Sequence, residues 1–172
     1  MELTLDRIFL DCSVRCLNEL ASRVDDCLCR LDGSQVWFRG GESQNAVGNL
    51  VLHLAGNVRQ WVVSGVSGAP DVRDRDAEFA ARSGAGVGEL RQLLGATVRK
   101  AATVVASVPP ARLAERVRIQ GYDVTVLEAI YHVVEHFAQH TGQIVFATKA
   151  ATGEDLGYYA HLSKAAHGRQ TP

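Results

Sequence analysis

The stretch that decides the fold is TVLEAIYHVVEHFAQHTGQIVFATKAA, residues 125–151. Thr125 is followed three residues later by Glu128, which is the capping-box pattern that marks the start of a helix. Apolar residues then recur at helical spacing, and Gly153 follows the last of them as a stop signal. The stretch therefore predicts one long amphipathic helix. Its apolar stripe is Val126, Ile130, Val133, Phe137 and Ile144.

Apolar spacing of three and four dominates the rest of the chain as well, and the alternation typical of strands is nearly absent. The predicted helices cover residues 3–31, 86–108 and 125–151, together with a second helix that begins near Ser43 or Asn45 and ends at Ser64. Residues 34–45 and 111–121 are predicted to be loops. Residues 65–85 are rich in Gly, Asp and Arg, and they form a connection long enough to let the second and third helices run parallel. The fold class expected is all-α.

The length of the chain suits a single domain. With 172 residues, of which 47% are hydrophobic, it can bury one full core and is too short for two ordinary domains. We expect a helical domain over residues 1–155 and a C-terminal tail over residues 156–172. The tail holds Tyr158, Tyr159 and Leu162, enough to dock a short element, while its histidines, His161 and His167, are not counted as site candidates.

The charge pattern excludes several classes of partner. Eighteen Lys and Arg against nineteen Asp and Glu give a formal net charge of -1, with the two signs interspersed. Such a surface is poorly suited to a phosphate backbone, so no nucleic-acid partner is expected. We expect no membrane partner, because no run of eighteen apolar residues occurs and the N-terminal residues lack the apolar region of a signal peptide. A cytoplasmic location follows as an expectation.

Four cysteines lie within the first thirty residues, where a disulfide framework or a zinc site is one interpretation. Cys12, Cys16 and Cys27 fall on the predicted inner stripe of the first helix, where a free cysteine behaves as a small hydrophobe. That stripe also includes Leu5, Phe9, Leu20, Val24 and Leu31. One helix cannot bring Cys12 and Cys27 together, so we favour structural or incidental thiols in a reducing compartment.

Three histidines stand four residues apart in the helix predicted at 125–151, and imidazoles at this spacing share one helix face. At about 100° per residue, His140 lies within the apolar stripe, His136 about 40° to one side, and His132 further round. Two inward-facing imidazoles one turn apart can hold a metal ion with a ligand from a neighbouring helix. Alternatively, each is an ordinary partly buried histidine bonded to a carboxylate or a carbonyl.

A fourth histidine, His53, lies near the middle of the second predicted helix, in GNLVLHLAGNVRQW, residues 48–61. It is at the edge of the apolar face, beside Asn57 and Gln60. By its position alone it is a lone helical histidine, which is more often a structural residue than a ligand.

Four segments together resemble the DinB/YfiT-like superfamily, in one of its uncharacterised branches. They are SQNAVGNLVLHLAGNVRQW (43–61), RDRDAEF (73–79), YHVVEHFAQHTGQIVFATK (131–149) and TGEDLGYYAHL (152–162). The specific feature is a histidine in the first segment combined with H-x-x-x-H-x-G-Q in the third. The resemblance covers nearly the whole chain.

The resemblance implies a four-helix bundle with up-down-down-up topology, in agreement with the long connection at 65–85. It places the metal ligands on His53, His136 and His140 and gives no ligand role to His132. We expect three residues to surround the ligands without binding the ion. They are His132 as a wall of the cleft, Gln143 as a residue that orients a ligand or a bound water, and Asn57 beside His53.

Three neutral imidazoles leave open positions on a divalent ion, which is the arrangement of catalytic sites. Zinc or nickel suits such ligands and lowers the pKa of a bound water or thiol. Characterised members of the superfamily are metal-dependent hydrolases or transferases that use low-molecular-weight thiols. The resemblance therefore implies a thiol S-transferase or hydrolase acting on a small-molecule substrate, with a low-molecular-weight thiol as co-substrate. No catalytic residue besides the ligands can be assigned, because Glu135 points away around the helix.

Two further possibilities stay open. The chain is alternatively a non-catalytic, stress-associated protein whose metal ion ties the second helix to the fourth. The resemblance also implies a homodimer, for which Trp61 and the aromatic residues of the tail are candidate interface residues.

Overall fold

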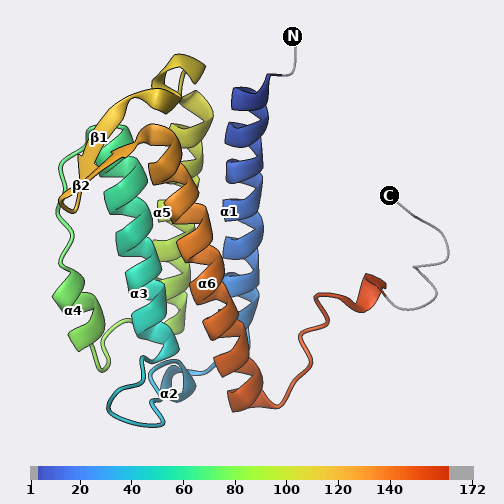
Figure 1. The fold of residues 1–172 in the computed structure, drawn as a ribbon. Helices are drawn as coiled ribbons and strands as arrows, with labels where there is room; N and C mark the ends of the chain where they lie inside the picture. The colour runs from blue at the N-terminus through green and yellow to red at the C-terminus, as the bar shows by residue number, and fades with distance from the viewer. Residues whose placement is uncertain (1–3, 163–172) are drawn as a thin grey trace.

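The computed structural model describes residues 4–162, so the end of the predicted tail, with His167, lies outside the described residues. Four long helices dominate it. They are α1 (Leu5–Cys29), α3 (Val47–Val58), α5 (Val87–Ser107) and α6 (Val126–Thr152). Both α1 and α3 pack against α5 and α6. Figure 1 shows α1 and α6 running in one direction and α3 and α5 in the other. The prediction of a mostly helical chain is confirmed.

Helix α6 begins and ends as its sequence predicts. The Thr125 side chain accepts a hydrogen bond from the Glu128 amide, and the Glu128 carboxylate accepts one from the Thr125 amide. At the other end, Gly153 adopts the left-handed conformation with a φ of 71°. Glycine is favoured there because it has no Cβ to clash with the preceding turn. The two signals fix the helix that carries three of the histidines.

The core lies between the four long helices, but the stripe predicted for α1 was wrong in its first half. Leu5 is 83% exposed, whereas Leu10 and Leu17 are completely buried. Cys12 and Cys16 are only partly buried as a result. The first half of α1 carries two apolar stripes of similar periodicity, and packing against α5 and α6 selects the one that contains the leucines. Cys27 is buried, Cys29 is exposed, and all four cysteines are free thiols.

Two short helices occupy segments that were predicted to be connections. Helix α2 (Gly33–Val36) begins at Asp32, whose side chain accepts hydrogen bonds from the next turn. Helix α4 (Arg75–Ala80) begins at Asp74 in the same way. Both are too short to show an apolar period, so only their capping residues mark them in the sequence.

The connection at 111–121 is more ordered than predicted. The 3-10 turn η2 (Pro110–Ala114) leads into two antiparallel strands, β1 (Arg116–Ile119) and β2 (Tyr122–Thr125). Gln120 and Gly121 join them with positive φ angles of 52° and 82°, as in the two-residue turns that suit the twist of a hairpin. The all-α prediction is therefore corrected by one small sheet.

Helix α3 continues into a wider π-helical segment, η1 (Arg59–Val66). The hairpin packs against it, because Gly65 leaves room for the Ile119 side chain; a Cβ at Gly65 would lie 2.3 Å from Ile119 Cδ1. At the other end of the molecule, Leu156 is buried and the Tyr158 hydroxyl lies 3.2 Å from the Arg23 carbonyl oxygen of α1. No helix among residues 4–162 has the length and apolar character needed to cross a bilayer.

Candidate metal site

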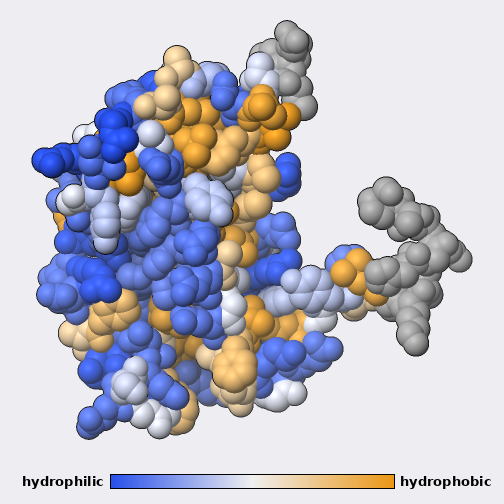
Figure 2. All heavy atoms as spheres, viewed as in Figure 1, coloured by the Kyte–Doolittle hydropathy of each residue, from blue (hydrophilic) through white to orange (hydrophobic). Residues whose placement is uncertain are grey.

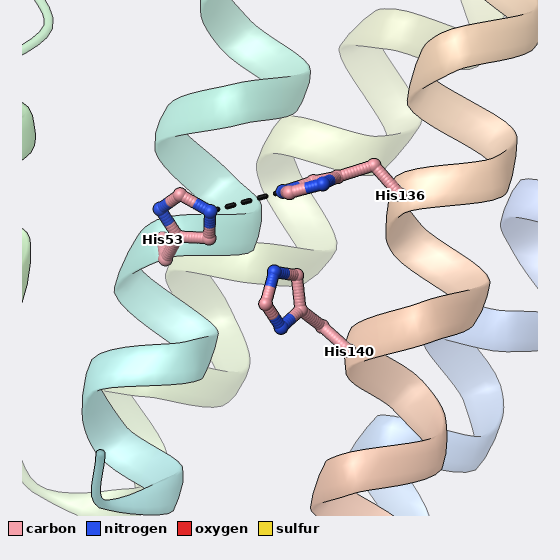
Figure 3. Close-up of side chains that lie close together, drawn as sticks. All are labelled: His53, His136 and His140. Carbon is pink, nitrogen blue, oxygen red and sulfur yellow. Dashed lines mark hydrogen bonds between the residues drawn. The ribbon is translucent and has the colours of Figure 1, made fainter. Parts of the chain in front are cut away.

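Helices α3 and α6 lie side by side, and each brings histidines to the seam between them. His53 comes from α3, and His136 and His140 come from α6. Each has a ring nitrogen within 4.8 Å of the other two, and Figure 3 shows the three rings gathered around a common space. The predicted ligand residues are therefore brought together, although 83 residues separate the two sides of the cluster.

The spacing of the nitrogens suits ligands of one ion. His53 Nε2 lies 2.9 Å from His136 Nε2. Two nitrogens that are each about 2.0–2.1 Å from one ion lie about 2.9 Å apart at a right angle and about 3.4 Å apart at the tetrahedral angle. The two nitrogens are at hydrogen-bonding distance, as the dashed line in Figure 3 marks, and the same separation is compatible with two ligands of one divalent ion.

The two histidines of α6 are held neutral. Burial, with smaller contributions from the neighbouring His140 and His53, lowers the pKa of His136 to about 3. Burial also lowers the pKa of His140. A metal ion binds only the neutral form of imidazole. Both rings are therefore in the ligand form at neutral pH.

A buried carboxylate fixes the orientation of His53. Glu78 Oε2 lies 3.0 Å from His53 Nδ1. Burial by itself raises the pKa of Glu78, but hydrogen bonds from Arg73 and His53 outweigh it, so that pKa lies below its usual range. An ionised carboxylate only accepts hydrogen bonds, so His53 Nδ1 carries a proton, and in the neutral ring that a metal ion binds it is Nε2 that presents a lone pair to the cluster. A carboxylate behind a ligand histidine is a recurrent arrangement in metal sites.

Arg73 holds the carboxylate in turn. Its side chain is 2% exposed, and its Nε and Nη2 each donate to one oxygen of Glu78 at 2.8 Å. Its Nη1 donates to Gln60 Oε1 at 2.9 Å. Arg73 Nη2 also lies 3.0 Å from His53 Nδ1, but both atoms carry hydrogens, so this closeness reflects their shared partner, Glu78 Oε2. The fork geometry of the guanidinium locks the carboxylate in place.

The approach of Glu78 to α3 requires a glycine at position 56. A Cβ on Gly56 would lie 1.8 Å from Glu78 Oε1 and 3.0 Å from Arg73 Nε. No side chain fits there while the carboxylate stays on His53. Gly56 is therefore part of the support of the candidate site.

Gly56→Ala is expected to push Glu78 away from His53 and to weaken metal binding about 10- to 100-fold, the usual effect of losing such a support. The measurement is competition for zinc against a chromogenic chelator. Gly88→Ala is the matched control, because Gly88 is also helical and has no atom within 4 Å of the added Cβ. Equal zinc affinity in the two variants would contradict the assigned role of Glu78.

Gln143 lies where the sequence places it, next to a candidate ligand. Its Oε1 lies 2.7 Å from His140 Nδ1. The amide oxygen accepts, so Nδ1 is the protonated nitrogen of His140 and Nε2 keeps its lone pair. Gln143 thus sets the tautomer of His140 as Glu78 sets that of His53.

His132 and Asn57 lie beside the cluster and not within it. The His132 ring packs on Trp61, with 4.1 Å between ring centroids, and stacks on His136 at 5.4 Å. Asn57 is buried one turn after His53, and its Oδ1 has no hydrogen-bond partner among the described residues. The two residues form the wall of the seam on the side of η1.

Sequence reasoning missed Glu78 and Arg73. Both belong to RDRDAEF (73–79), a segment interpreted as a charged connection. The signal available in the sequence was Asp74, a capping residue that marks the start of α4. This short helix packs against α3 and carries Glu78. Glu135 is exposed, in agreement with the expectation that it points away from the ligands.

Comparison with known proteins places this architecture in a family. A crystal structure of a conserved protein from Enterococcus faecalis is similar, with a TM-score of 0.68 and 15% identity over 89% of this chain and all of that one. At this identity the likeness shows the fold alone. No curated protein matches the sequence. A family model described as "Protein of unknown function (DUF1572)" matches residues 5–163. Since this match spans nearly the whole chain, the protein belongs to the DUF1572 family.

Proposed function

We propose that the protein is an enzyme that binds one divalent metal ion through His53, His136 and His140. The observation that carries the proposal is the cluster itself, in which three imidazole nitrogens from two helices lie within 4.8 Å of one another. With only three protein ligands, a bound ion keeps positions for water or substrate. His136 and His140 are only partly buried, so these positions are accessible from the seam.

The proposed chemistry is thiol S-transfer or hydrolysis of a small molecule. A zinc or nickel ion suits three imidazoles and, when bound, supplies a nucleophile by lowering the pKa of a coordinated water or thiol. The chain's own part is orientation. Glu78 and Gln143 keep the Nδ1 protons of His53 and His140 in place, which leaves the two Nε2 lone pairs free for the ion.

We further propose that the chain is DinB/YfiT-like and that its long helices form an up-down-down-up bundle. The opposite directions of the pair α1 and α6 and the pair α3 and α5 in Figure 1 support this topology. The long connection between η1 and α5, which contains α4, is also what a parallel α3 and α5 require.

The remaining parts of the proposal concern partners and organisation. We propose a cytoplasmic homodimer with a low-molecular-weight thiol as co-substrate and no nucleic-acid or membrane partner, in line with the interspersed charges. Residues 1–155 form the functional domain and residues 156–172 the tail. Trp61 is 4% exposed and so has little surface to offer to a dimer, whereas Tyr159 is 63% exposed.

Elemental analysis of protein purified without a histidine tag or chelator tests the site. We expect about one equivalent of zinc or nickel in the wild type and loss of the ion in His53→Ala and His136→Ala, since two imidazoles hold an ion poorly. His161→Ala is the matched control, because His161 is exposed and lies outside the cluster. Full metal content in either ligand variant would show that the ion binds elsewhere.

A second candidate function is that of a non-catalytic protein in which the ion is structural. The observation in its favour is that the cluster joins α3 to α6 and that His53 is only 4% exposed. Turnover separates the two candidates. The metal-loaded wild type should convert at least one thiol and acceptor pair faster than His136→Ala, and equal rates across a broad screen would favour the structural ion.

A further inference from the structure

A groove of about 500 Å³ runs between the α2 end of the molecule and the C-terminal half of α6. Its volume is in the range of small-molecule sites. The apolar part of its lining includes Leu31, Phe38, Val47, Leu50, Phe146 and Ala147. Figure 2 shows apolar side chains over this lower end of α6, separated by polar surface from the apolar surface at the upper end of the molecule.

The groove meets the candidate metal site at Gln143. This residue lines the groove, and its Oε1 accepts a hydrogen bond from His140 Nδ1 at 2.7 Å. Leu50, on the opposite wall, precedes His53 by one helical turn on α3. The groove and the cluster are therefore consecutive parts of the same seam between α3 and α6.

The lining of the groove contains no charged side chain. Its polar members are glutamine, serine and asparagine residues, all neutral. Three smaller hollows on the described part of the surface each include charged residues, such as Arg91, Lys149 and Glu78. An ion placed in the groove would lose water without gaining a partner of opposite charge. A neutral group is the occupant that this lining favours.

The mouth of the groove exposes aromatic surface that an apolar occupant would cover. Phe146 is 76% exposed and Phe38 is 69% exposed. Exposed apolar surface of this kind, rimmed by polar residues, marks binding sites. The groove extends to Gln143, whose side chain is bonded to His140, which suits the tail of a small molecule with its polar head at the histidines.

We propose that the groove binds the neutral alkyl or aryl tail of the substrate, while the substrate's polar head reaches the ion at His53, His136 and His140. The placement of the head rests on the proposed function; the binding of the tail rests on the groove alone. The substrate class is thus a small molecule with a metal-binding head and an uncharged apolar tail.

A series of hydroxamates tests the proposal, because the hydroxamate head binds metal and the alkyl tail can be lengthened. Acetohydroxamate, hexanohydroxamate and octanohydroxamate are titrated into the zinc-loaded protein by calorimetry. The affinity is expected to rise about three- to fourfold for each added methylene that enters the groove. Equal affinities along the series, with acetohydroxamate still bound, would overturn the groove inference and leave the metal site intact.

Two variants locate the effect. Ala147→Trp fills the groove and is expected to abolish the dependence on chain length while acetohydroxamate binds as before. Ala138→Trp is the matched control on α6, since Ala138 is exposed and does not line the groove. If Ala147→Trp fails to fold, Phe38→Ser combined with Phe146→Ser removes only exposed side chains and should weaken octanohydroxamate several-fold. An unchanged chain-length dependence in that double variant would overturn the inference.

A probe that needs no metal separates this inference from the proposed function. The neutral dye N-phenyl-1-naphthylamine is expected to bind the metal-free protein and to be lost in Ala147→Trp but not in Ala138→Trp. Absence of dye binding to the wild type would overturn the inference even if the metal site is correct. Analytical sedimentation tests a different occupant of the groove. If the wild type is a dimer and Ala147→Trp is a monomer, a second copy of the chain occupies the groove, and this result would also overturn the inference.

Discussion

Glu78→Ala is expected to destabilise the protein by about 3–5 kcal/mol, because it leaves the Arg73 guanidinium buried without its partner. Arg73 is 2% exposed and donates to both oxygens of Glu78. The same substitution removes the acceptor of the His53 Nδ1 proton, so metal affinity should fall as well. Urea denaturation measures the first effect and zinc competition the second.

The two effects can be separated with a double variant. Replacing Glu78 with leucine and Arg73 with methionine removes both charges, and such apolar replacements often restore stability. Metal affinity should stay low in this variant, because His53 Nδ1 still lacks its acceptor. Asp123→Ala is the control for a lost ion pair, since its partner Arg116 is exposed and the pair contributes little. A double variant with wild-type metal affinity would show that the carboxylate does not support His53.

Removal of the ion is the second large effect. An ion present at about 1,000 times its dissociation constant stabilises the folded state by about 4 kcal/mol. For a chain of this size that corresponds to a fall in Tm of roughly 10 °C when a chelator is added. The His136→Ala variant should show no such fall, because it binds no ion at the cluster. Differential scanning calorimetry of both proteins, with and without chelator, makes the comparison.

The chelator experiment has its own internal check. The His161→Ala variant keeps the three histidines of the cluster, so its Tm should fall by as much as that of the wild type when the chelator is added. If the chelator lowers the Tm of His136→Ala by the same amount as that of the wild type, the stabilising ion does not bind at these histidines. Readdition of zinc should restore the wild-type Tm, since His136 and His140 are neutral and ready to bind at neutral pH.

The sequence was most informative about features that depend only on residues close together in the chain. The capping box at Thr125 and Glu128 and the stop at Gly153 depend only on nearby residues, so the bounds of α6 were predicted closely. The spacing of His136 and His140 likewise places both on one face of that helix. Periodicity cannot say which helix lies opposite, so His53 entered the candidate site through family resemblance.

The sequence was least informative where tertiary packing decides. Leu5 and Leu10 both fit a helical stripe in α1, and only the packing of α1 against its neighbours selects Leu10. Helix α4 has six residues and each strand of the hairpin has four, too few to establish a period. Glu78 was missed for this reason, since its burial depends on where α4 docks and on the space left by Gly56.

The position of the histidines along the chain has a consequence for the order of folding. His53 and His136 are 83 residues apart, and α4, α5 and the hairpin must all be synthesised between them. A hairpin of two adjacent helices could trap an ion early, but here no contiguous fragment smaller than residues 53–140 carries all three imidazoles. Closing so long a segment costs entropy that only the packed helices offset. Metal uptake would therefore mark the completion of folding, so a nascent chain captures its ion only after α6 has docked.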